Sequence, residues 1–386
     1  MLSVNFTIIY IAAMQIQLPF IVRLTLALLC IIMLGYLAII GKSILSPLLF
    51  SLLMAFLMLP LASFIEVKLR LSRSVATILS VIIMLAILYG VGHFFATQLS
   101  ELWSDWPLLR KQVTNSFHEL QHWISKTFHV NISKQETYLA DSAEKALATS
   151  ATVVGTTLIT LSSSLLFVAF TLLFTFFMLN YRRLLYKFLS TVFIEEHRIK
   201  VTETISEIQY IIKKYITGLF IQMVIVSILM TLTLSLLGVK YAILLGLVAG
   251  IFNIIPYLGI SISLIISVLI TFATAGATKA LFVLFAYIGI HAIDGNILMP
   301  LIVGSKVKIN ALIAFIGIVV GEMIWGISGM FLCMPYLAML KIIFQKVEGL
   351  DAWAILLGEE QKAEPKKKRI KFFKLDKVIK TDERTE

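Results

Sequence analysis

The stretch SLLFVAFTLLFTFFML at residues 164–179 contains no charged side chain and no regular alternation of apolar and polar residues. Apolar runs of about 20 residues, long enough to cross ~30 Å of hydrocarbon as a helix, recur along the chain. A transmembrane β-barrel would need short alternating segments instead. The chain is 59% hydrophobic and 14% charged, with a mean hydropathy of +0.95. An ordinary soluble domain is only about half apolar. The sequence therefore predicts an all-α, polytopic helical membrane protein.

The distribution of basic residues indicates how the chain is oriented. Polytopic membrane proteins keep Lys and Arg on the cytoplasmic side, so the formal net charge of +11 needs no nucleic-acid partner. The basic loop EVKLRLSR at 66–73 and the tail EPKKKRIKFFKLDKVIK at 364–380 predict cytoplasmic N- and C-termini. Cys30 and Cys333 lie in separate apolar runs and fit neither a disulfide framework nor a metal-ligand spacing. We expect no cofactor and no metal site.

Polar segments divide the chain into six parts. We predict N-terminal membrane spans (1–97), a small helical extracytoplasmic insert (98–150), a fourth span (151–180), a cytoplasmic surface helix and linker (181–216), a C-terminal membrane transport core (217–344) and a basic cytoplasmic tail (345–386). The insert carries SKQE at 133–136, a capping-box pattern that opens a helix.

Two apolar blocks, 241–274 and 310–344, are longer than one crossing requires. The first would measure ~51 Å as a continuous helix, well beyond the hydrocarbon thickness. Broken or re-entrant helices explain the excess, and each block then crosses the membrane once or twice. The predicted break and gating positions are Pro256, Gly259, Pro300, Gly326, Gly329 and Pro335.

The insert contains HELQH at 118–122, which matches the HExxH pattern of zinc proteases. In that hypothesis His118 and His122 bind zinc while Glu119 activates water. However, the surrounding helix is predicted to be amphipathic and extramembrane, whereas an intramembrane protease needs the pair in an apolar helix. Phe128 also occupies the place of a third histidine at the metzincin spacing. The alternative is an amphipathic helix with two solvated histidines.

The segment HAIDGNILMP at 291–300 carries Asp294, the only aspartate between residues 142 and 350. An unpaired carboxylate near the bilayer centre costs ~2.5–3.5 kcal/mol on insertion scales, and such residues mark ion or substrate pathways. His291 lies one helical turn before Asp294. Asn296 and the carbonyls released before Pro300 add neutral oxygen ligands. The alternative is that Asp294 caps a broken helix at the interface and takes no part in transport.

Two further polar positions lie within the long apolar blocks. The segment FNIIPYLG at 252–259 combines Asn253 with helix breakers. Transporters use broken helices of this kind as binding sites, and the alternative is a structural kink. Glu322 lies deep in the last block, within VVGEMIWG at 319–326. Glu322 is a second candidate carboxylate for the substrate or cation path. The alternative is a carboxylate at the membrane interface or between subunits.

The segments FNIIPYLG, IDGNILMPLIVG and MPYLAMLK, in this order, resemble the signatures of the autoinducer-2 exporter family of bacterial membrane proteins. The resemblance implies about eight spans with both termini inside, and export of autoinducer-2 or, for some members, sodium or proton antiport. The family motifs fall on Asn253, Pro256, Gly259, Asp294, Gly295, Asn296, Pro300, Gly326, Gly329 and Pro335. Ile260 departs from the family, which commonly has proline there, and Glu322 stands where a small residue is expected.

We therefore predict a transporter and not an enzyme. It would export a small polar solute, with autoinducer-2 as the candidate, across the bacterial inner membrane. Na+/H+ antiport is the alternative, and a zinc-protease function of HELQH is a further one. The expected partners are the lipid bilayer and the solute or cation, and a homo-oligomer remains open. The predicted path residues are Asp294, Asn296, His291, Asn253 and Glu322.

Overall fold

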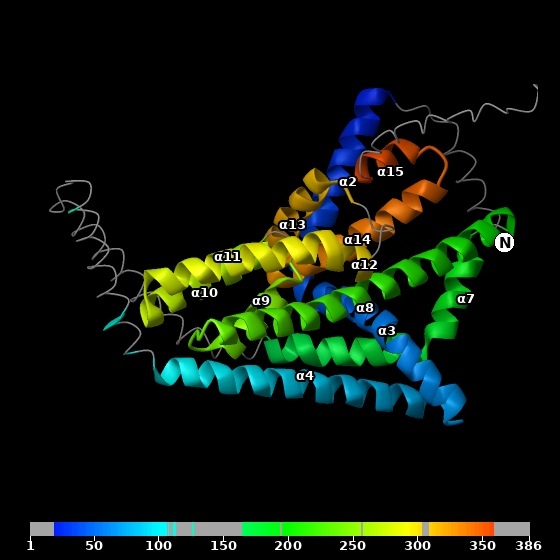
Figure 1. The fold of residues 1–386 in the computed structure, drawn as a ribbon. Coiled ribbons are helices and arrows are strands. Elements are labelled where there is room, and N and C mark those ends of the chain that lie inside the picture. The colour runs from blue at the N-terminus through cyan, green and yellow to red at the C-terminus, as the bar shows by residue number, and fades with distance from the viewer. Residues whose placement is uncertain are drawn as a thin grey trace, which may run out of the picture.

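The computed structural model describes residues 19–105, 107, 111–112, 126, 164–193, 195–255, 258–302 and 309–358. These residues are almost entirely helical, with one isolated β-bridge between Ile309 and Gly358 (Figure 1). The principal elements are α2 (Phe20–Ile40), α3 (Lys42–Lys68), α4 (Arg73–Ser104), a helix at Ser164–Asn180, α7 (Arg182–Val192), η2 (Glu195–His197), α8 (Arg198–Leu236), α9 (Ala242–Phe252), α10 (Leu258–Ala275), α11 (Ala277–Ile293), η3 (Asp294–Leu298), α12 (Met299–Ile302), α13 (Ala311–Trp325), α14 (Ile327–Lys346) and α15 (Asp351–Leu357).

The helices confirm a polytopic membrane protein. Among the described residues, six helices are long and apolar enough to cross a bilayer. A seventh span is formed if Ser164–Asn180 and α7, which meet at an angle of 69°, count as one. Large apolar side chains cover the outside of the bundle, and α2 has no buried residue at all. Such a surface is suited to lipid rather than to water.

Helices α8 and α9 form a hairpin with close backbone contacts. Gly238, with φ of +63°, lies in the turn between them. A Cβ atom on Gly246 would lie 2.7 Å from the backbone nitrogen of Thr231, and one on Gly250 would lie 2.5 Å from the carbonyl oxygen of Met223. Small residues spaced four apart allow membrane helices to approach this closely. The two helices therefore run antiparallel at short separation.

The last apolar block also folds back on itself. Gly326, with φ of +66°, separates α13 from α14. A Cβ atom on Gly329 would lie 1.9 Å from the carbonyl oxygen of Gly321, so the two helices touch through their backbones. The hairpin is fixed to the N-terminal helices, because Trp325 donates a hydrogen bond to the carbonyl of Ala38 (2.9 Å) and Tyr336 donates to that of Leu49 (2.9 Å).

The junction predicted at residue 216 is not marked by a break. Helix α8 runs without interruption for 39 residues from Arg198 to Leu236, about 58 Å. It therefore combines the predicted surface helix with the following span. Its first half turns a buried apolar stripe onto α3, α4 and α14, with Ile212 and Ile216 fully buried. This packing stabilises the helix beyond the membrane span, which explains why the mixed-charge composition did not end it.

A polar cluster joins the end of α4 to the α8–α9 turn. Asp105 accepts hydrogen bonds from Lys240 Nζ (2.7 Å) and from the Tyr241 hydroxyl (2.5 Å). These bonds favour the charged carboxylate and lower the pKa of Asp105. The Asp105 carboxylate in turn raises the pKa of Lys240.

Candidate functional site

Helix α11 passes directly into a π-helical turn at Asp294–Leu298. The backbone nitrogen of Met299 donates to the carbonyl of Asp294, five residues earlier. Pro300 has no N–H and its ring disfavours a regular α-turn, so the widened turn accommodates it. Single π-turns of this kind frequently occur at functional sites. The local sequence therefore produces an irregular helix where the sequence predicts a polar break.

Both carboxylate oxygens of Asp294 are held by amide groups from other parts of the chain. Oδ1 accepts a hydrogen bond from Gln222 Nε2 in α8 (2.7 Å), and Oδ2 accepts one from Asn253 Nδ2 in the turn after α9 (3.1 Å). Asp294 is only 5% exposed and Gln222 only 6%. Three segments far apart in the sequence thus meet at one carboxylate. Two of these residues, Asn253 and Asp294, are path residues predicted from the sequence.

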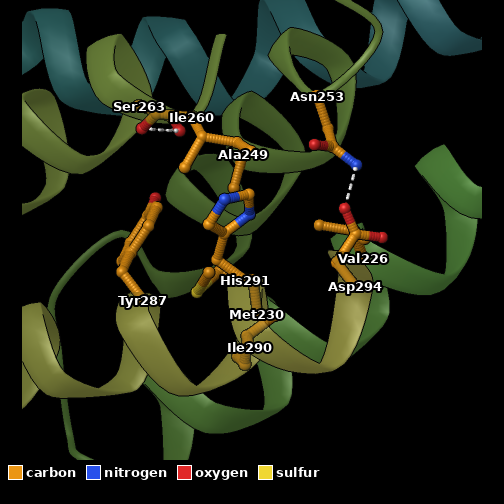
Figure 2. A pocket seen from close by; sticks show the side chains of 10 residues that line it. All are labelled: Val226, Met230, Ala249, Asn253, Ile260, Ser263, Tyr287, Ile290, His291 and Asp294. Atoms are coloured by element: carbon orange, nitrogen blue, oxygen red, sulfur yellow. Dashed lines mark hydrogen bonds between the residues drawn. The ribbon is translucent and has the colours of Figure 1, made fainter. Parts of the chain in front are cut away.

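A small pocket adjoins the carboxylate. Figure 2 shows His291 and Tyr287 of α11 facing Ile260 and Ser263 of α10, with Asn253 above Asp294. Its volume is about 10 Å³, roughly the minimum that one water molecule needs. The full lining comprises Val226, Met230, Ala249, Asn253, Ile260, Ser263, Tyr287, Ile290, His291 and Asp294. The wall is mostly apolar, and its polar groups gather around the carboxylate and along α10 and α11.

The site lies inside the apolar layer of the bundle. Gln222 belongs to an uncharged run of α8, about 12 Å along the helix from Lys214 and about 21 Å from Leu236 at the other end. One apolar cluster packs before it along α8, around Leu219, and another packs after it, around Met230. This position favours an intramembrane carboxylate over one at the interface.

Not every predicted path residue joins this site. Asn296 is exposed and its amide donates to the carbonyl of Ala292 within its own helix (2.8 Å). Glu322 is exposed on α13 and is not part of the pocket lining. The expectation that Asn296 and Glu322 accompany Asp294 is therefore not supported by their positions. On a helix, residue 296 points away from the face that carries residue 294, because successive residues are turned by about 100°.

Gly259 and Gly326 fall at junctions between helices, whereas Pro335, which was predicted as a break, lies inside α14, and this helix runs unbroken from Ile327 to Lys346. Gly259 lies at the start of α10, where a Cβ atom would come 1.6 Å from the carbonyl oxygen of Phe252. Gly326 and Gly329 form the α13–α14 hairpin, Pro335 is buried inside α14, and Pro300 lies in α12. Pro256 and the motif containing His118, Glu119 and His122 lie outside the described residues. A gating role of these positions stays a prediction.

Gln222 was missed by the reasoning from sequence. It is the only amide side chain between Thr217 and Leu237, an uncharged run in which the other polar side chains are hydroxyls. A buried amide in a membrane helix needs a hydrogen-bond partner. This requirement is the signal by which Gln222 could have been identified from the sequence. A second buried polar contact, between Ser267 and the Tyr287 hydroxyl (2.6 Å), continues from the pocket between α10 and α11.

Comparison with known proteins agrees with this architecture. Residues 28–349 match the sequence model of the family described as AI-2E family transporter. The chain is 26% identical over 344 residues to the AI-2 transport protein TqsA of Escherichia coli strain K12, covering 86% of this chain and 96% of TqsA. It is 25% identical over 343 residues to YhhT of the same organism, covering 87% and 94%. YueF of Bacillus subtilis strain 168 is 23% identical over 308 residues, covering 78% and 83%. Since the family match spans most of the sequence, this chain belongs to the AI-2E family of transporters.

Proposed function

We propose that this transporter exports a small polar solute across the bacterial inner membrane, with AI-2 as the candidate, and that Asp294 lies on the transport path. The observation that carries the proposal is a carboxylate buried in the apolar layer with both oxygens held by amides from two other elements. Ionisable groups in such positions are costly and mark substrate or ion pathways. The name of TqsA supports AI-2 as the first solute to test.

The amide partners suit a carboxylate whose charge changes. An ionised carboxylate only accepts hydrogen bonds, and the N–H groups of Gln222 and Asn253 donate to it. Each amide also carries a carbonyl oxygen. A half-turn of the terminal torsion presents that oxygen to a bound cation, to a protonated Asp294 or to a solute hydroxyl. The same three side chains can thus satisfy the empty and the loaded site.

The pocket is too small for an organic solute in this conformation. Space for about one water molecule does not admit a molecule of several carbon and oxygen atoms. Passage of the solute therefore requires α11 and its π-turn to move away from α8 or α10. A bare sodium ion or a proton fits the pocket in its present size, although antiport also requires the site to open to each side in turn. This observation supports Na+/H+ antiport as the second candidate function.

The remaining assignments follow the sequence pattern. Gln222, Asn253 and Asp294 all fall within residues 217–344, which supports this segment as the transport core. We assign the basic loop at 66–73 and both termini to the cytoplasm by the distribution of Lys and Arg.

The test is transport into proteoliposomes, with labelled AI-2 and a pH-sensitive dye followed in parallel. Asp294→Asn keeps the shape of the side chain and removes its charge. Under antiport it abolishes the sodium- and pH-dependent flux, whereas solute export driven by another source retains substantial flux of AI-2. Asn296→Ser is the matched control, because Asn296 lies two residues away and bonds only within its own helix among the described contacts. If Asp294→Asn transports AI-2 and protons at the wild-type rates, the proposal that Asp294 lies on the transport path is wrong.

The outcome for wild type tests the function itself. Flux of AI-2 without flux of sodium or protons identifies a solute exporter, and the reverse identifies the antiporter. An inactive wild type that binds zinc stoichiometrically, with the metal lost in His118→Ala, would overturn the transporter proposal in favour of the HELQH motif.

A further inference from the structure

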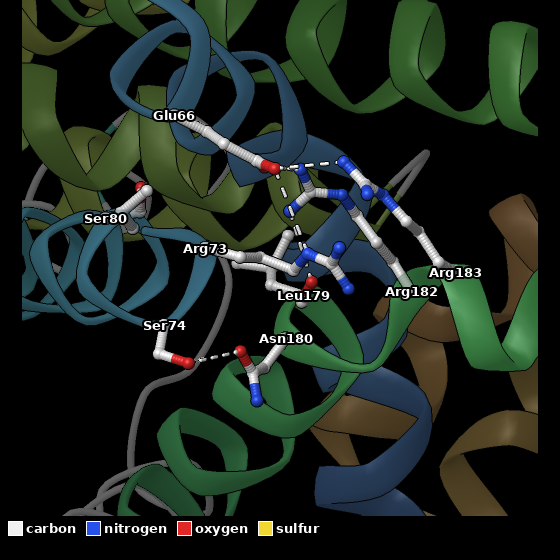
Figure 3. A network of polar contacts seen from close by, with 9 residues as sticks. Glu66, Arg73, Ser74, Ser80, Leu179, Asn180, Arg182 and Arg183 are labelled. Carbon is white, nitrogen blue, oxygen red and sulfur yellow. Dashed lines mark hydrogen bonds and ion pairs between the residues drawn. The ribbon is translucent and has the colours of Figure 1, made fainter. Parts of the chain in front are cut away.

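Three arginines surround one glutamate at the end of the bundle opposite the Asp105 cluster. Glu66 lies in the last turn of α3, Arg73 is the first residue of α4, and Arg182 and Arg183 open α7. Figure 3 shows their guanidinium groups gathered around the Glu66 carboxylate. Arg182 bonds to one carboxylate oxygen, and Arg183 Nη2 lies 3.0 Å from the other.

The single carboxylate does not neutralise this cluster. Arg182 is satisfied, because it also donates to the carbonyl of Leu179 (3.2 Å). Arg73 Nε lies 3.9 Å from Glu66 Oε1, beyond hydrogen-bond distance, and it is buried without a hydrogen-bond partner among the described residues. Arg183 is 67% exposed and keeps most of its donors free for the surface. Three positive charges against one leave an excess of two.

The helix ends increase this positive potential. Arg73 and Arg182 stand in the first turns of α4 and α7, and neither first turn contains an acidic residue. A helix N-terminus carries about half a positive charge and favours anions, so basic residues there are normally unfavourable. An anion bound at this place would satisfy both helix ends and the surplus guanidinium groups. Within the described residues, Glu66 is the only acidic group paired with these arginines.

The surface next to the cluster is apolar. Exposed apolar side chains lie within a few residues of the cluster on the four helices that meet there: Phe64 (56%), Ile78 (45%), Phe177 (43%), Tyr181 (49%) and Leu184 (62%). Apolar side chains make no favourable contact with a small hydrated anion. A phospholipid matches both parts, because its phosphate meets the arginines while its acyl chains cover the apolar side chains.

We propose that Arg73 and Arg183, organised by Glu66 and Arg182, bind the phosphate group of an anionic phospholipid. The planar guanidinium fork matches phosphate oxygens in pairs. Basic pockets between membrane helices are a known class of lipid headgroup site. The lipid bridges α4 and α7, and so ties the first helices of the chain to the segment that leads into α8. This site is separate from Asp294 and does not depend on the proposed substrate.

The test is lipid binding by the purified full chain, measured by native mass spectrometry with phosphatidylglycerol and with phosphatidylcholine. We compare wild type with Arg73→Gln/Arg183→Gln. The control is Lys68→Gln/Lys187→Gln, which removes the same charge from exposed residues at the same end of the bundle. With about 5-fold in affinity per basic residue, the arginine variant is expected to bind phosphatidylglycerol about 30-fold more weakly. The lysine variant should stay within about 5-fold of wild type.

Equal losses in the two variants would overturn the proposal in favour of a diffuse surface charge. Competition of inorganic phosphate for the arginines, with no preference of wild type for phosphatidylglycerol, would overturn it in favour of a soluble anion. If the arginine variant does not fold, thermal unfolding of wild type in nanodiscs decides. Phosphatidylglycerol should raise the Tm relative to phosphatidylcholine, and equal Tm values would contradict a lipid site.

Discussion

The hydrogen bond from Gln222 to Asp294 should contribute measurably to stability. Gln222→Leu keeps the approximate volume of the side chain and leaves Oδ1 of a buried carboxylate without its 2.7 Å donor. Hydrogen bonds to charged groups contribute about 1.5–3 kcal/mol, whereas those between neutral groups of membrane helices average only ~0.6 kcal/mol. Because the acceptor is a carboxylate that is 5% exposed, we expect a loss of about 1.5–3 kcal/mol in the free energy of unfolding.

A double-mutant cycle isolates this term from the effect of side-chain shape. Asp294→Leu alone leaves the amides of Gln222 and Asn253 unpaired, but the double variant with Gln222→Leu leaves only Asn253. The double variant should therefore lose about 1.5–3 kcal/mol less than the sum of the two single losses. Unfolding in mixed detergent micelles measures all four proteins, with Asn296→Leu as the exposed control. Additivity within about 0.5 kcal/mol would refute the reasoning.

Three further outcomes follow from the geometry. Since hydrogen bonds lower the pKa of Asp105, its ionised form stabilises the fold above the ordinary pKa of 3.8 and loses this effect as the pH falls through the lowered value. Between about pH 5 and pH 2 the Tm of wild type should fall more than that of Asp105→Asn, and parallel curves would contradict the Lys240 bond. Gly250→Ala, which forces the α8–α9 backbones apart, should cost about 1–3 kcal/mol in unfolding assays. Gly289→Ala, with open space around it, should be neutral or slightly stabilising. Glu322→Gln should retain wild-type flux in proteoliposomes, and a tenfold loss would place Glu322 on the path.

The sequence predicted most of the helical framework, because apolar length and glycine position act locally. Helix α2 ends before Gly41, and the α8–α9 turn contains Gly238. The two long apolar blocks also break, at the turn after Phe252 and at Gly326. The continuity of α8 was not predictable in the same way. It depends on tertiary packing of its first half, which a charge pattern alone does not reveal.

The site was predictable in part. Asp294 and Asn253 were singled out because a carboxylate or a helix break in an apolar run is conspicuous. Their meeting with Gln222 depends on the packing of α8 against two later elements, and no local pattern specifies that partner. Asn296 lies on a different face of the helix from Asp294, because proximity in sequence does not give a shared helical face, and its place on the path stays a prediction. Glu322 is conspicuous by the same rule as Asp294, but α13 turns it outward.

The π-turn at Asp294–Leu298 accommodates one more residue than a regular α-turn. In an α-helix each residue rotates the chain by about 100° and advances it by ~1.5 Å. Deleting a single residue from the π-turn would close it as an α-turn and leave α12 in nearly the same orientation relative to α11. Replacing the exposed Ile297 would alter one surface position. The turn therefore accommodates one additional residue without rotating the helix that follows α11.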